Sequence, residues 1–162
     1  MDEVGIESID TKEDFMKYME AVSKDGRFGY GGSWEKTYAS NEIAQFVNMF
    51  GGDYFDWTKE ENKEAIQFLH DLVANKETPV DQIADKYDQM NPKINDGKYG
   101  CWFMWGLGTD YAKADMLGAD KIHMAMVPDF SGNGERAIFT DSWNYVLNSA
   151  SKNKDCLLYT SP

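Results

Sequence analysis

Five tryptophans are the most chemically distinctive residues of this chain. A sugar ring has one apolar C–H face and a belt of hydroxyls, so an aromatic side chain can bury the face while carboxylates and amides bond the hydroxyls. Trp34, Trp105 and Trp143 lie in turn-like sequence beside Gly or Ser, which is typical of an aromatic wall exposed in a cleft. A place in the core is the alternative for each of the five, and we expect Trp102, inside an apolar run, to be there.

Catalytic and metal-binding motifs are not found. Neighbouring acids such as Asp53 and Asp56 abound, but a glycosidase needs two carboxylates facing each other across a cleft, about 5 to 9 Å apart. No GxSxG elbow, HExxH motif, P-loop or dinucleotide fingerprint occurs. The two histidines lie far apart and the two cysteines form no CxxC pair. We therefore expect no catalytic residue, metal or cofactor, with a carbohydrate-active enzyme or a lectin-like accessory module as the alternative function.

The charge of the chain restricts its partners. With 28 acidic and 16 basic residues, the formal net charge is −12. Nucleic acids and anionic membrane surfaces both need clustered Lys and Arg, so neither is an expected partner. A neutral polar ligand is compatible with this charge. The apolar runs are too short to cross a bilayer, and the acidic start Met1-Asp2-Glu3 is no secretion signal, which read literally would indicate the cytoplasm.

Helical periodicity is interrupted by short apolar runs, which indicates an α/β fold that is rich in helix and has a small sheet. Thr11 and Asp14 predict a capping box at the start of one helix, and Thr58 with Glu61 predicts another for a helix over 59–74. Gly51-Gly52 is expected to end the helix between them. A single helix is predicted from Pro79 to Pro92.

The predicted sheet comes from two apolar runs bounded by Gly and Pro. These are Tyr99–Met104 and Lys121–Val127. A last strand is predicted over 137–147. Its apolar side chains Ile138, Phe139, Val146 and Leu147 are expected to be unusually exposed.

The order of several short motifs resembles that of family 1 extracellular solute-binding proteins, the ligand-capturing components of bacterial ABC importers. The motifs include Phe50-Gly51-Gly52, Asp96-Gly97-Lys98-Tyr99-Gly100, Val127-Pro128 and Ser151-Lys152-Asn153-Lys154, and the likeness covers residues 4 to 155. The start departs from the family pattern, since Ser8-Ile9-Asp10 stands where a proline is usual. The resemblance implies one lobe of a two-lobed periplasmic-binding-protein type II fold, in which two α/β lobes close on the ligand.

The same resemblance implies how the chain is divided. Residues 1–8 would follow the first hinge crossing, 9–136 would form the C-terminal lobe, and 137–155 would recross the hinge toward an N-terminal lobe outside this chain. The tail 156–162 resembles a translated sequencing adapter, so we expect it to be non-native. A secretion signal and lipid anchor would precede the chain, which places the full protein in the periplasm or at the cell surface.

The resemblance also implies the function. The protein would bind a mono- or oligosaccharide and deliver it to an ABC permease, meeting the membrane only through that permease or the anchor. Its aromatic content points to sugar, and a peptide- or polyamine-binding member is the alternative if cleft acids outnumber aromatics. The predicted ligand-binding residues are Trp34, Asn41, Glu42, Trp105, Asp141 and Trp143.

Overall fold

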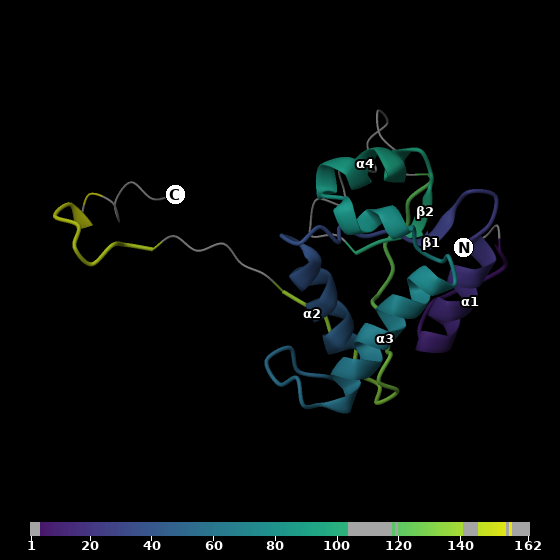
Figure 1. The fold of residues 1–162 in the computed structure, drawn as a ribbon, viewed down its shortest axis with the longest axis horizontal. Helices are drawn as coiled ribbons and strands as arrows, with labels where there is room; N and C mark the ends of the chain where they lie inside the picture. The colour runs from purple at the N-terminus through teal and green to yellow at the C-terminus, as the bar shows by residue number, and fades with distance from the viewer. Residues whose placement is uncertain (1–3, 104–117, 119, 141–145, 155, 157–162) are drawn as a thin grey trace.

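The fold is known from a computed structural model, which describes residues 4–103, 118, 120–140, 146–154 and 156. Helices make up most of its regular structure (Figure 1). In chain order the elements are α1 (Lys12–Val22), β1 (Phe28–Tyr30), α2 (Ala39–Met49), α3 (Glu60–Ala74), the 3₁₀ helix η2 (Val80–Ala84), α4 (Tyr87–Asn95) and β2 (Tyr99–Cys101). This is the helix-rich α/β arrangement with a small sheet that the sequence predicts.

Local signals at two helix ends act as predicted. The Thr11 hydroxyl accepts from the backbone N–H of Asp14 at 3.2 Å, and the Asp14 carboxylate accepts from the N–H of Thr11 at 3.2 Å. This capping box satisfies two of the N–H groups that a helix start leaves without a partner. After α2, Gly51 takes a φ of +78°, a conformation that Gly adopts without steric cost.

The predicted capping box of α3 is wrong. Lys59 stands at the N-cap and provides no side-chain hydrogen bond. The Thr58 hydroxyl instead donates to the Asp56 carboxylate at 2.6 Å, and the Thr58 N–H donates to the same oxygen at 3.1 Å. The Thr58 hydroxyl therefore bonds the short acidic side chain of Asp56, two residues earlier, instead of capping the start of α3.

The two described strands pair with each other in parallel. Phe28 lies opposite Tyr99 and Tyr30 lies opposite Cys101. The predicted strand over 121–127 is not formed. This segment lies outside the sheet, and two of its alternating side chains, Met124 and Met126, are exposed. Its continuation makes only a single parallel bridge, between Thr11 and Asp129.

The predicted helix from Pro79 to Pro92 is two helices. Asp85 has a ψ of 129°, an extended conformation that separates η2 from α4. The backbone carbonyls of Gln82 and Asp85 accept from the N–H groups of Trp34 and Glu35, each at 3.2 Å. These tertiary hydrogen bonds replace helical ones, and Pro92 lies inside α4 instead of ending it.

An aromatic core joins the first three α-helices to the sheet. Phe46 of α2 contacts Tyr30 edge-on with ring centroids 5.5 Å apart, and Phe68 of α3 contacts Phe130 at 5.3 Å. Edge-to-face geometry at this distance adds roughly 1 kcal/mol per pair to the burial of the rings. Tyr30 and Phe46 are fully buried, so the end of β1 is anchored firmly against α2.

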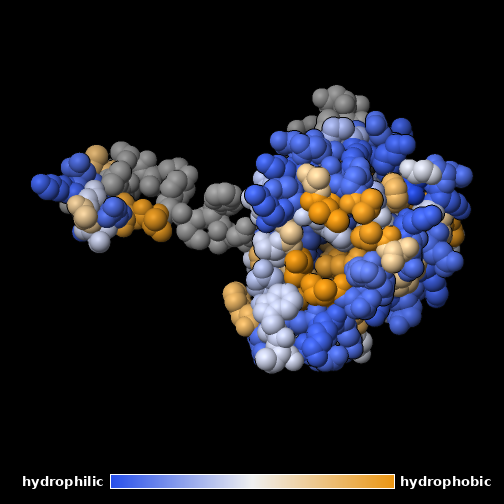
Figure 2. All heavy atoms as spheres, viewed as in Figure 1, coloured by the Kyte–Doolittle hydropathy of each residue, from blue (hydrophilic) through white to orange (hydrophobic). Residues whose placement is uncertain are grey.

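Polar side chains cover most of the face in Figure 2, where an apolar strip lies between α4 above and α2 and α3 below.

Further along the chain, the described part of the predicted last strand, 137–140 and 146–147, is not in a strand. Its apolar side chains are exposed as expected, by 55% for Ile138 and 87% for Val146. The Gln45 amide holds this segment on α2, accepting from Phe139 N–H at 2.9 Å. Among the described residues, no helix has the length and apolar character needed to cross a membrane.

Candidate functional site

The carboxyl ends of β1 and β2 lie at the same edge of the sheet because the strands are parallel. In α/β folds this edge is where ligands bind. Gly31-Gly32-Ser33-Trp34 follows β1 there, and Trp102 and Phe103 follow β2. The backbone passes very close to β2, since a β-carbon on Gly31 would lie 2.2 Å from the ring of Tyr99. Only glycine fits at this position.

Glu42 of α2 is buried beneath this loop, with 5% of its surface exposed. The Tyr30 hydroxyl donates a short hydrogen bond to Glu42 Oε2, and the N–H of Ser33 approaches Oε1 at 3.5 Å. Burial raises the pKa of Glu42 to about 7, although both hydrogen bonds act to lower it. The buried Tyr30 hydroxyl also has a pKa raised well above its usual value, first by desolvation and then by Glu42.

The Trp34 side chain approaches Gly32 closely. A β-carbon on Gly32 would lie 2.6 Å from Trp34 Nε1 and 3.2 Å from Glu42 Oε1, so the indole and the carboxyl meet around this glycine. The indole ring is half-buried. Its Nε1 atom is buried and has no hydrogen-bond acceptor among the described residues.

Asn41 is half-buried beside Glu42 on α2, and its side chain hydrogen-bonds the hydroxyl of Tyr87. Tyr87 also contacts Tyr38 edge-on, with ring centroids 4.7 Å apart. Asn41 therefore has a structural partner in α4 and lies at the margin of the site. Burial raises the pKa of Tyr87 to about 12, with the Glu42 carboxyl as the next cause.

The structure thus brings together Trp34, Asn41 and Glu42 of the predicted set. Trp105, Asp141 and Trp143 lie outside the described residues, so their place in the site stays a prediction. Of the other tryptophans, Trp102 packs against the cluster that contains Met90 and Ile94, as expected of a core residue.

Two residues of this site were missed from the sequence. Tyr30 is one, and Gln82 of η2 is the other, with its side-chain carbonyl accepting from Gly32 N–H at 3.0 Å. Ser33 is held to the same region, because its hydroxyl donates to the backbone carbonyl of Asp85 at 2.9 Å. Tyr30 lies in a Gly-rich, aromatic segment and Gln82 in a predicted helix, and nothing in their local sequence indicates a shared site.

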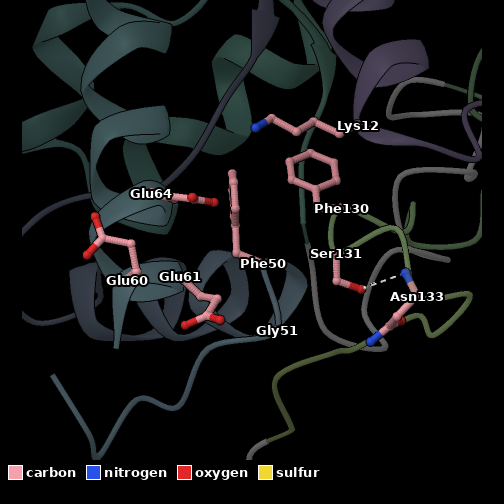
Figure 3. A pocket seen from close by; sticks show the side chains of 9 residues that line it. All are labelled: Lys12, Phe50, Gly51, Glu60, Glu61, Glu64, Phe130, Ser131 and Asn133. Carbon is pink, nitrogen blue, oxygen red and sulfur yellow. Dashed lines mark hydrogen bonds between the residues drawn. The ribbon is translucent and has the colours of Figure 1, made fainter. Parts of the chain in front are cut away.

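A second concave region lies at the start of α3, with a volume of about 360 Å³ (Figure 3). Phe50 and Phe130 form its apolar surface, and the Lys12 ammonium sits 4.6 Å above the ring of Phe50. Figure 3 shows three glutamates on the α3 side of the cavity, namely Glu60, Glu61 and Glu64. Acids outnumber aromatics here, but Lys12 already supplies a cation to the aromatic face.

No curated protein and no solved structure matches this chain, but a protein family does. The family model for bacterial extracellular solute-binding proteins matches residues 1–158 of the 162. The match agrees with the order of sequence motifs and with the helix-rich α/β fold that has a small parallel sheet. The chain is therefore a member of the bacterial extracellular solute-binding protein family.

Proposed function

We propose that this protein binds a neutral extracellular carbohydrate at the strand-end site and delivers it to an ABC permease. The observation that carries the proposal is the meeting of the Trp34 indole and the Glu42 carboxyl around Gly32. They come from a loop and a helix that the fold brings to the carboxyl edge of the sheet. An aromatic face with a hydrogen-bonding acid beside it is the pair of features that a sugar ring requires.

The roles of the site residues follow from their chemistry. Trp34 would stack on the apolar face of the ring, and Glu42 would accept from a hydroxyl. Asn41 would bond a second hydroxyl at the margin of the site. We propose that Trp105, Asp141 and Trp143 complete the site with two further stacking surfaces and one acceptor.

The ionisation of Glu42 favours a neutral ligand over a cationic one. Because its pKa is about 7, a large share of the molecules carry an uncharged carboxyl at neutral pH. A sugar hydroxyl can hydrogen-bond the charged or the uncharged form, whereas a polyamine gains from the charged form alone. The buried acid is hydrogen-bonded to the Tyr30 hydroxyl, whereas a glycosidase needs a second carboxylate that faces the first across a cleft, about 5 to 9 Å away. We therefore propose binding without catalysis.

A ¹⁵N NMR titration of the five tryptophan indole N–H signals tests this proposal. The protein is titrated with D-glucose, D-xylose, maltose and cellobiose up to high millimolar concentrations, so that weak binding is still detected. We expect at least one sugar to shift the Trp34 signal, which the Trp34→Ala variant identifies by its absence.

Trp57 provides the matched control, since it is exposed by 51% and packs on Tyr54 away from the strand ends. Trp34→Ala is expected to weaken binding roughly tenfold or more, from the loss of one stacking surface and its hydrogen bond. Trp57→Ala should bind as the parent protein does. Equal affinities of the two variants, or no shift with any sugar, would overturn the proposed function.

A further inference from the structure

Gln82 is a buried polar residue of the strand-end site with half of its hydrogen-bonding capacity unused. None of its surface is exposed. Its side-chain oxygen accepts from the backbone N–H of Gly32 at 3.0 Å, and its backbone oxygen accepts from Trp34 N–H at 3.2 Å. Because the Gly32 N–H needs an acceptor, the first bond sets which end of the amide faces the loop.

The NH₂ end of the Gln82 amide is then a donor without an acceptor among the described residues. The Trp34 indole N–H is a second such donor. Both groups lie close to Gly32. The Gln82 amide accepts from the Gly32 N–H through its oxygen, and the Trp34 indole nitrogen lies 2.6 Å from the position of a β-carbon on Gly32. Buried N–H groups without an acceptor are rare in folded proteins, because each one loses its hydrogen bond to water.

Glu42 supplies the complementary group beside the same glycine. Its Oε2 accepts from the Tyr30 hydroxyl, while among the described residues Oε1 has only the long hydrogen bond from the Ser33 N–H at 3.5 Å. The surroundings of Gly32 therefore hold two N–H donors that need an acceptor and one carboxyl oxygen with a long hydrogen bond. A hydroxyl group matches this set, because its oxygen accepts two hydrogen bonds and its proton donates one.

We propose that Gln82 and Trp34 bind a hydroxyl group of the ligand. The hydroxyl oxygen accepts hydrogen bonds from their two N–H groups, and the hydroxyl donates a hydrogen bond to the Glu42 carboxyl. This inference rests on the proposed sugar site and adds a specificity-determining residue, Gln82, to it. A ligand carboxylate would accept from both donors, but Glu42 would repel it in the share of molecules that carry the charged carboxyl. A ligand ammonium would satisfy Glu42 and leave both N–H groups without an acceptor.

Two substitutions separate this reading from a structural role. Gln82→Glu keeps an acceptor for the Gly32 N–H and replaces the NH₂ donor with oxygen. Trp34→Phe keeps an aromatic face and removes the indole N–H. The matched controls are Gln67→Glu on the exposed surface of α3 and Trp57→Phe. Affinities are measured by NMR titration with the sugar that binds the parent protein best, and thermal melts report folding.

Each of the two site variants is expected to bind that sugar roughly tenfold more weakly than the parent protein. The same titrations with its monodeoxy analogues identify the hydroxyl that is read. For the analogue that lacks it, the parent protein and both variants should bind equally weakly. A merely structural effect would weaken the binding of every analogue by a similar factor, and that result would overturn the inference. If Gln82→Glu does not fold, Trp34→Phe with the analogues decides.

The outcomes distinguish the two proposals. If Trp34→Ala loses binding while Trp34→Phe and Gln82→Glu bind like the parent protein, the reading of a hydroxyl is wrong and the sugar site stands. If none of the sugars shifts the Trp34 signal in the parent protein, the proposed function is wrong and the inference fails with it.

Discussion

The strand-end site and the cavity at the start of α3 use the same residue type in opposite ways. Glu42 and Glu60 each lie in the first turn of a helix, where the helix dipole favours a negative charge. Glu42 is buried and accepts a hydrogen bond from the Tyr30 hydroxyl, whereas Glu60 is exposed and pairs with Lys63 at 2.6 Å. Exposed pairs of this kind contribute little to stability or recognition. The comparison shows that burial, and not the number of acids, distinguishes the strand-end site from the α3 cavity.

The largest expected effect is a pH dependence of stability that comes from Glu42. Its pKa rises from 4.5 to about 7 on folding. Below the lower value the carboxyl is protonated in both states. Between the two values only the folded protein keeps the proton, so the free energy of unfolding falls as the pH rises, by about 3 kcal/mol in all.

Urea denaturation of the parent protein and of Glu42→Gln at about pH 5 and about pH 8 measures this contribution. The amide can still accept from Tyr30 but does not titrate, so the difference between the two proteins should change by about 3 kcal/mol across this range. Glu60→Gln is the control from the other region. An identical pH dependence in the parent protein and Glu42→Gln would show that burial of Glu42 is not maintained in solution.

The next effect concerns the close approach of the loop to β2. Gly31→Ala places a methyl group 2.2 Å from the Tyr99 ring, which must move. Overpacking of this kind costs about 2 kcal/mol. Gly132→Ala is the control, because nothing lies within 4 Å of its added methyl and only its φ of +71° resists the change. Urea denaturation should rank Gly31→Ala as the less stable variant; the reverse order would contradict the tight packing of the strand-end loop.

The third prediction extends the strand-end site to a residue that follows β2 in sequence. We expect Trp105→Ala to weaken sugar binding roughly tenfold through loss of a stacking surface. The melting temperature of the unliganded protein should be nearly unchanged, because a cleft aromatic contributes little to the core. Titration and a thermal melt of the same sample check both parts. A variant that unfolds at a lower temperature while its affinity is preserved would make Trp105 a core residue.

The smallest effect is expected in the α3 cavity. Lys12→Met keeps the aliphatic stem over Phe50 and removes the ammonium, whose cation–π contact with the ring contributes about 0.5 to 1 kcal/mol. Lys17→Met, on the exposed surface of α1, is the control. The difference in free energy of unfolding between these variants is measured in urea. A loss as large as that of Gly31→Ala would mean that the cavity is as tightly organised as the strand-end site.

Much of the local structure was predictable from short segments. Thr11 caps the start of α1, and Gly51 follows the end of α2 with a positive φ. Both were predictable because the interacting groups are a few residues apart and their geometry depends on little else. The apolar run that begins at Tyr99 also forms a strand, over Tyr99–Cys101. The family match over residues 1–158 agrees with an order of motifs that is visible in sequence. The composition of the candidate site, with Trp34 beside acids and amides, was also visible there.

Contacts between distant segments decided the rest. Whether β2 pairs with Phe28–Tyr30 or with 121–127 depends on which strand the helices cover, and sequence alone favours the wrong partner. The break at Asp85 exists because the loop after β1 takes carbonyl groups that a continuous helix would use. Gln82 and Glu42 become neighbours of Gly32 only when η2 and α2 pack against that loop. Side-chain types and local caps are properties of the sequence, whereas burial is a property of the tertiary structure. Burial raises the pKa of Glu42 and, among the described residues, leaves the N–H donors of Gln82 and Trp34 without an acceptor.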